Sequence, residues 1–143
     1  MTNRQIINRK KFEQKVSFEG LQYEKKSPTD IDFCLEIENK ILIIGEIKEK
    51  GKDVPQGQNL AFKRIVDAWN ARPGMITMGF YVVLHHEQND DADIVAANCK
   101  VVSYYYDKTL VDTFNGTLKE FLFFIGKILG VDWLTKLKDK MNG

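Results

Sequence analysis

Two short stretches decide how this chain is organised: SPTDID at residues 27–32 and GEIK at residues 45–48. Each stretch adjoins an apolar run that is typical of a β-strand. The charged side chains in the two stretches are Asp30, Asp32, Glu46 and Lys48. A charge on a core strand is unfavourable unless it is paired or bound to a metal. We therefore expect these side chains to serve chemistry rather than stability.

The two apolar runs are predicted to form a hairpin. Apolar and polar residues alternate over 31–37, which predicts a strand with one apolar face. Residues 41–48 are almost continuously apolar, as in a strand that is covered on both faces. Asn39 lies between the two runs and tolerates the positive φ of a tight turn.

The register of this hairpin decides whether the charges meet. With a loop at 38–40, Asp32 stands opposite Glu46, and the same count puts Asp30 opposite Lys48. Residues that stand opposite each other in an antiparallel pair project to the same face. With a two-residue loop, Asp32 and Glu46 would point to opposite faces. The sequence favours the first register and leaves the second open.

Two carboxylates at a strand end are suited to Mg²⁺ or Mn²⁺, which prefer oxygen ligands. The carbonyl of Ile47, between Glu46 and Lys48, is a candidate for a further ligand. Such a metal polarises a phosphorus centre and lowers the pKa of a bound water. Lys48 is expected to orient that water or to neutralise charge that develops on the phosphate. Without a metal, close carboxylates would repel one another and take up protons.

The composition is that of an ordinary globular protein. The chain has 143 residues, of which 43% are hydrophobic and 29% charged, so we expect a single domain over residues 1–143. A net charge of +1 disfavours a uniformly basic protein that coats nucleic acid. Residues 1–26 carry seven Lys or Arg against three Glu, which indicates either a local phosphate-binding patch or a solvated face.

The cysteines and the apolar segments bear on the compartment. Cys34 and Cys99 are far apart and have no metal-binding spacing, which disfavours a disulfide framework and a structural zinc site. Buried free thiols in a reducing cytoplasm are expected instead. The first residues are polar and basic, so we expect no signal peptide there, and the apolar runs are shorter than a membrane span. We expect a soluble cytoplasmic protein with no membrane partner.

Helices alternate with strands along the rest of the chain. The strongest helix pattern covers 58–71, with Gln58, Phe62, Ile65 and Trp69 on one stripe. The other expected elements are helices over 5–16, 117–129 and 131–141 and strands over 17–23, 75–84 and 99–106. This order predicts an α/β fold, a single mixed β-sheet flanked by helices, with extra helices at the C-terminal end.

The motifs in order resemble the PD-(D/E)XK nuclease superfamily. An aspartate followed by Glu-x-Lys on a hairpin, with a helix before and after, is the family's pattern. More closely, PTDID at 28–32, GEIK at 45–48 and PQGQ at 55–58 are similar to small phage-type members related to Holliday junction resolvases. The resemblance implies a restriction-endonuclease-like core.

The same resemblance implies roles for individual residues. Asp32 and Glu46 would be metal ligands and Lys48 the catalytic lysine, with Asp30 a competitor for the first ligand position. Gln58 resembles a glutamine that some members carry near the metal. The acidic residue that many members have on the first helix would be Glu13 or, alternatively, Glu19. The residues expected to contact phosphates are Lys25, Lys26, Lys63 and Arg64.

The expected function is that of a Mg²⁺-dependent endonuclease that hydrolyses DNA and selects branched or recombination intermediates, in a bacterial host cell if a phage encodes it. A homodimer would suit symmetric junctions, and the apolar run at 121–125 is a candidate contact. The alternatives are a catalytically inactive nuclease-fold module that binds nucleic acid or a protein, and a structural domain whose hairpin carries surface ion pairs.

Two other features are weaker. His85 and His86 are adjacent on an expected strand, so their side chains point to opposite faces and do not ligate one ion together. The three tyrosines at 104–106 offer rings for base stacking, but aromatic residues are also common strand formers.

Overall fold

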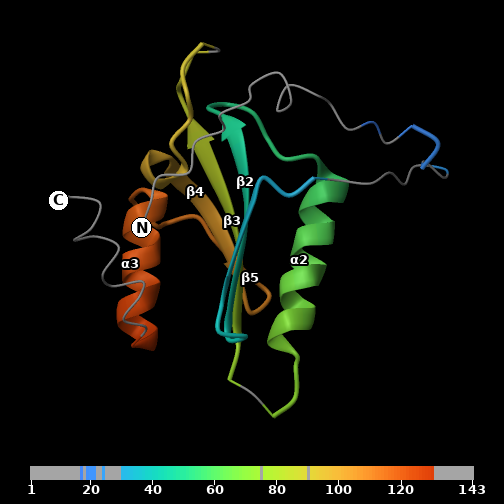
Figure 1. Ribbon diagram of the computed structural model, residues 1–143, viewed down its shortest axis with the longest axis vertical. Coiled ribbons are helices and arrows are strands. Elements are labelled where there is room, and N and C mark those ends of the chain that lie inside the picture. The colour runs from blue at the N-terminus through green and yellow to red at the C-terminus, as the bar shows by residue number, and fades with distance from the viewer. Residues whose placement is uncertain are drawn as a thin grey trace. The chain divides into compact units, whose positions relative to one another are not determined.

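The computed structural model describes residues 17, 19–21, 24, 30–74, 76–89 and 91–130 (Figure 1). The chain divides into two units, Met1–Asp30 and Ile31–Gly143. The described residues of the first unit are exposed, and none of them is in a strand, so the strand expected over 17–23 is not found there. The helices expected over 5–16 and 131–141 lie outside the described residues.

The described part of the second unit contains a five-stranded mixed sheet in the order β1-β2-β3-β4-β5. The strands are β1 (Phe33–Ile37), β2 (Ile41–Glu49), β3 (Met78–His86), β4 (Lys100–Tyr106) and β5 (Thr109–Val111). β2 and β3 are parallel and every other pair is antiparallel. The helices are α2 (Gln56–Asn70), α3 (Leu118–Leu129) and a short 3₁₀-helix, η1 (Ala96–Asn98). The predicted α/β fold with one mixed sheet is confirmed.

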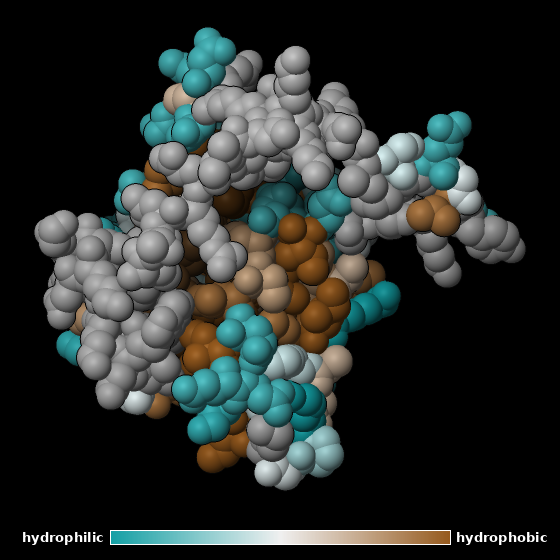
Figure 2. All heavy atoms as spheres, in the orientation of Figure 1, coloured by the Kyte–Doolittle hydropathy of each residue, from teal (hydrophilic) through white to brown (hydrophobic). Residues whose placement is uncertain are grey.

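The two long helices cover opposite faces of this sheet (Figure 1). On the α3 face, Ile41 and Ile43 of β2 pack with Phe121 of α3 in one apolar cluster. On the α2 face, Leu42 and Ile44 pack with other residues in a second cluster. β2 is therefore apolar on both sides because both sides are covered, as its composition predicts. Figure 2 shows apolar side chains gathered in the middle of the view, where the strands run between the two helices.

Helix α2 begins at Gln56 and ends at Asn70, close to the predicted bounds. Its buried residues are Phe62 and Val66, whereas Ile65 is 42% exposed. The predicted stripe was therefore wrong at Ile65. The buried line of this helix runs from Phe62 to Val66, four positions on, and not from Phe62 to Ile65, three positions on. Gln58 lies one turn before Phe62 on that buried line and is half-buried.

The hairpin has the register that brings the charges together. Ile37 pairs with Ile41 and Phe33 with Gly45, which leaves residues 38–40 as the loop. Asn39 has a φ of 63°, as predicted, and the Lys40 N–H donates to the Ile37 carbonyl at 2.9 Å. Arg72, just after α2, donates to Asn39 Oδ1 at 2.7 Å and ties the tip of the hairpin to the helix. The two-residue loop is excluded.

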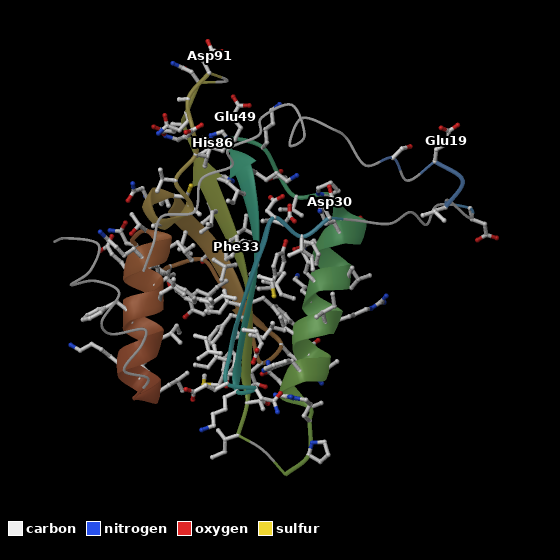
Figure 3. The ribbon with its side chains drawn as sticks, viewed as in Figure 1. Glu19, Asp30, Phe33, Glu49, His86 and Asp91 are labelled. Carbon is white, nitrogen blue, oxygen red and sulfur yellow. The ribbon has the colours of Figure 1, made fainter. Side chains whose placement is uncertain are left out.

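Gly45 allows a close approach within this hairpin. A Cβ atom built at Gly45 would lie 1.7 Å from Cε1 of Phe33, its cross-strand partner. The Phe33 ring, labelled in Figure 3, therefore lies directly over the glycine backbone. Any side chain at position 45 would displace the ring and disturb the start of β1, next to Asp32.

Strand β5 has no counterpart among the predicted elements. It follows a two-residue turn at Asp107 and Lys108, both of which have positive φ (50° and 61°). Turns of this kind usually have Gly at the second position, where this chain has Lys108, so the sequence carries no strong signal here. Helix α3 has nearly the predicted bounds. Thr117 caps its first turn in a capping box with Glu120. Of the helices in the described part of the chain, none has the length and apolar character to cross a membrane.

Candidate active site

Asp32 and Glu46 lie on the same face of the sheet. Glu46 follows Ile44 by two residues and therefore points toward the α2 face, as Ile44 does. Phe33 and Leu35 pack on the α3 face, so Asp32, one residue before Phe33, is directed to the α2 face. The pair Phe33–Gly45 places Asp32 opposite Glu46 at the next step. The structure thus brings together two of the predicted site residues.

Asp32 is held in place by the backbone of β2. Its Oδ2 accepts a hydrogen bond from the Ile47 N–H at 2.7 Å. The backbone pairing of the hairpin ends at Phe33 and Gly45. The Asp32 side chain therefore accepts from a β2 N–H that lies past the last backbone pair. The N–H and C=O of one strand residue point to the same side of the strand. The Ile47 carbonyl, the predicted third ligand, therefore faces the side on which Asp32 lies.

Glu46 is the most unusual residue of the sheet. It is only 1% exposed, and it is the one charged residue among the buried residues of the described chain. Within the same described part, its Oε1 is buried with no hydrogen-bond partner. Lys48 Nζ lies 3.9 Å from its Oε2, which is a long contact for an ion pair. Burial of this carboxylate is therefore only partly compensated.

The pKa of Glu46 reflects this environment. Burial is the largest cause, the charge of Asp32 is the next, and together they raise the pKa from 4.5 to about 7. Lys48 acts in the opposite direction but does not overcome them. Near neutral pH the Glu46 carboxyl is therefore poised between its protonated and ionised forms, and a cation beside it would favour the ionised form.

Tyr81 was not singled out by sequence reasoning. It is cross-strand partner to Ile44, is 1% exposed and packs against α2. Its hydroxyl is buried and has no hydrogen-bond partner among the described residues. Burial first, and then the charge of Glu46, raise the pKa of Tyr81. The only sequence signal was the period-two pattern of β3, which aims Tyr81 at the same face as His85.

Lys48 and Gln58 are the other two predicted site residues on the described elements. The Lys48 side chain is 29% exposed and lies on the Glu46 face, two residues further along β2. Gln58 is near the start of α2, which follows β2 after a short loop. The face of α2 that carries Gln58 and Phe62 covers the sheet, so Gln58 is directed toward the end of β2 where Glu46 and Lys48 lie.

The other predicted residues have different surroundings. Lys63 lies over the Tyr105 ring, with its Nζ 5.3 Å from the ring centre, and Arg64 is exposed. Asp30 is exposed and belongs to the first unit, so its pairing with Lys48 stays a prediction. Glu19 is also exposed in that unit. The candidates that lie outside the described residues are Glu13, Lys25 and Lys26.

The two cysteines are free as expected, but only one of them is buried. Cys99 is buried, but Cys34 is exposed because β1 is an edge strand whose α2-facing side is not covered there. His86 Nδ1 accepts a hydrogen bond from the Gln88 N–H at 3.2 Å. Figure 3 shows His86 and Glu49 near the ends of β3 and β2.

The carboxylate pair has the chemistry of a site for a hard divalent cation. Within the described ranges, no group of three or more His, Cys, Asp or Glu side chains is close enough to hold a metal. Mg²⁺, however, is usually bound through one or two carboxylates, with waters and substrate phosphates as the other ligands. The unpartnered Oε1 of Glu46 and the repulsion between Glu46 and Asp32 are both relieved by a cation. The residues present therefore fit such an ion.

Comparison with known proteins adds nothing to this geometry. No family model, no curated protein and no solved structure matches the chain.

Proposed function

We propose that this protein is a metal-dependent deoxyribonuclease with a restriction-endonuclease-like core, and that it hydrolyses phosphodiester bonds in DNA. One observation carries the proposal: the Glu46 carboxylate is buried beside Asp32 and has an oxygen without a partner. Asp32 is exposed, so of the two carboxylates only Glu46 is buried. A buried carboxylate that a second one repels destabilises a fold unless a cation joins them. A buried Glu46 beside Asp32 is therefore better explained by metal-dependent chemistry than by stability.

Asp32 and Glu46 would hold the ion, with the Ile47 carbonyl as a further ligand. A bound Mg²⁺ or Mn²⁺ supplies electrophilic assistance to the phosphate and a more acidic water. Donation from the Ile47 N–H orients Asp32 before any ligand arrives, which reduces the entropy lost on binding. Glu46 binds a cation in its ionised form, so loading of the site releases a proton over the pH range in which this group titrates.

Lys48 would act on the reacting groups. Its ammonium lies on the carboxylate face at 3.9 Å from Glu46, and its side chain is partly open to solvent. In this position it can orient the attacking water or neutralise charge that develops on the phosphate oxygens. Gln58, on the helix above the same strand end, would position the water or the DNA backbone by hydrogen bonds.

The test is cleavage of labelled DNA by purified protein. The panel contains linear duplex, nicked, single-stranded, flapped and four-way-junction DNA, each with Mg²⁺, with Mn²⁺ and with EDTA. We expect cleavage that requires the metal, with the strongest cutting on branched substrates. Asp32→Asn, Glu46→Gln and Lys48→Met are each expected to lower kcat by at least about a hundredfold.

Glu49→Gln is the matched control for this test. Glu49 is a carboxylate at the same end of β2, but it is exposed and points to the other face of the sheet. Its variant is expected to cut like the wild type. Cleavage that survives in Asp32→Asn and Lys48→Met would refute the assignment. DNA binding with no cleavage by the wild type would instead favour the inactive nuclease-fold module.

A further inference from the structure

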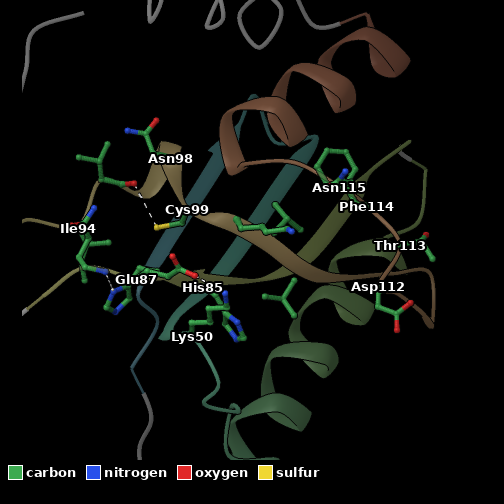
Figure 4. Close-up of a pocket in the computed structure, with 16 residues that line it drawn as sticks. Lys50, His85, Glu87, Ile94, Asn98, Cys99, Asp112, Thr113, Phe114 and Asn115 are labelled. Atoms are coloured by element: carbon green, nitrogen blue, oxygen red, sulfur yellow. Dashed lines mark hydrogen bonds and ion pairs between the residues drawn. The ribbon is translucent and has the colours of Figure 1, made fainter.

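A pocket of about 790 Å³ lies at the end of β3 and the start of β4 (Figure 4). Its walls come from the end of β3, the start of β4, the connection between these strands, and residues 112–115. The volume lies in the range of small-molecule sites, which are usually 300–1,000 Å³. None of the residues assigned above to the metal or to catalysis lines the pocket.

A row of basic side chains connects this pocket with the active site. Lys48 of β2 is the cross-strand partner of His85 in β3, and His85 is the partner of Lys100 in β4. Cross-strand partners project to the same face of a sheet, so the three side chains form one row. Adjacent strands are about 4.8 Å apart, so the row extends roughly 10 Å from Lys48. His85 and Lys100 themselves line the pocket.

The charges around the pocket leave Lys100 accessible to an anion. Lys50, another lining residue, forms an ion pair with Glu87 at 2.6 Å. Lys100 is exposed and forms no ion pair with a described carboxylate, although the charge of Glu87 acts on it and Asp112 also lines the pocket. A phosphate that follows the row from Lys48 would therefore meet a second lysine about one nucleotide away, at the mouth of the pocket.

The remaining walls suit a nucleobase. Asn98 and Asn115 present side-chain amides, each of which donates and accepts hydrogen bonds as base edges require. Ile94 and Val95 are 44% and 54% exposed and provide an apolar surface beside these amides. A base that has left its stack can pack its flat face against apolar side chains. A base in a duplex cannot enter a concave pocket without leaving its stack.

We propose that this pocket binds one unpaired nucleotide of the DNA strand, next to the phosphate at the metal site, and so selects DNA that has single-stranded ends or branch points. The proposal rests on the nuclease function above and specifies its substrate class. In this arrangement Lys100 and His85 contact the phosphate of the unpaired nucleotide, and the two asparagines contact its base.

Binding is measured without metal, so that hydrolysis plays no part. A short fluorescent thymidine oligonucleotide is titrated with full-length protein in EDTA, and its anisotropy is recorded. Lys100→Glu is expected to weaken binding about tenfold or more, and Asn115→Ala about threefold to tenfold. Lys108→Glu is the matched control, because it makes the same charge change at an exposed lysine beyond the other end of β4. It is expected to bind like the wild type.

A competition experiment distinguishes a pocket that binds a nucleotide from one that binds only phosphate. Thymidine 5′-monophosphate is expected to displace the oligonucleotide at a lower concentration than inorganic phosphate does, because the pocket contacts the base as well. Equal displacement by both competitors would overturn the assignment of a nucleotide pocket. A wild-type Kd for both Lys100→Glu and Asn115→Ala would also overturn it.

Cleavage distinguishes failure of this proposal from failure of the proposed function. If the wild type cuts DNA and Lys100→Glu cuts flapped and blunt substrates in the wild-type ratio, the pocket assignment is wrong and the nuclease assignment stands. If the wild type cuts no DNA but binds the oligonucleotide in a manner that depends on Lys100, the nuclease assignment is wrong and the pocket stands. We expect Lys100→Glu to lose the preference for flapped DNA and to keep its cleavage of blunt duplex.

Discussion

Replacing Glu46 by Gln is expected to make the metal-free protein more stable at neutral and alkaline pH. The wild-type carboxyl must ionise in a buried position beside Asp32, whereas the amide has nearly the same shape and no charge. A rise of the pKa from 4.5 to about 7 corresponds to about 3 kcal/mol of unfolding free energy. This value is the upper limit of the gain expected from Glu46→Gln.

The sign follows from the proton balance. Because the pKa of Glu46 is higher in the folded state, the folded protein binds more protons than the unfolded chain between about pH 4.5 and 7. The contribution of this group to stability is therefore fully present below that range and is lost as the pH rises through it. Glu46→Gln has no such dependence. The difference between the two proteins should be small near pH 4 and largest near pH 8.

Urea unfolding in EDTA at several pH values measures this difference. Other groups titrate in both proteins, so subtracting one stability curve from the other isolates Glu46. Glu49→Gln serves as the control and should show no such rise, because Glu49 is exposed. Mn²⁺ is expected to raise the Tm of the wild type and not that of Glu46→Gln, because the variant lacks the anionic ligand. If Glu46→Gln is less stable than the wild type near pH 8, the reasoning about the buried carboxylate is refuted.

Three further substitutions test the surroundings of the site. Gly45→Ala should lower the unfolding free energy by about 1–3 kcal/mol and slow cleavage, because its methyl group would overlap the Phe33 ring; adding Phe33→Ala should restore part of the stability measured in urea. Tyr81→Phe should leave stability in urea unchanged or raise it by about 1 kcal/mol, because the buried hydroxyl has no partner among the described residues; a clear loss would contradict this. Arg72→Ala should cost about 1–2 kcal/mol in the same assay by releasing Asn39, and a wild-type unfolding curve would show that the hairpin tip needs no such tie.

Local patterns in the sequence were sufficient for the hairpin and for the fold class. Alternation over 31–37, the apolar run after it and Asn39 between them define a strand, a turn and a strand from neighbouring residues alone. Once the loop spans 38–40, the opposition of Asp32 and Glu46 follows by counting. The alternation of helices and strands likewise predicts one mixed sheet with helices on its faces, as observed.

Elements without a local signal could not be predicted in this way. β5 depends on a turn in which Lys108 has a positive φ that lysine rarely adopts, and β4 supplies the partner that makes this strand possible. The exposure of Ile65 and the burial of Val66 depend on how α2 is rotated against the sheet. Such choices are made by packing between elements that are distant in the sequence.

The sequence by itself therefore determined which charged residues share the hairpin, because a hairpin is a local structure with a period of two. Only the tertiary structure decided what surrounds them. Covering of β2 by α2 buries Glu46, which raises the pKa of Glu46, and the charge of Glu46 contributes to the raised pKa of the nearby Tyr81. The order of the strands in the sheet aligns Lys48, His85 and Lys100, which are far apart along the chain. Hydrogen bonds between non-adjacent segments set that order, and no local pattern encodes it.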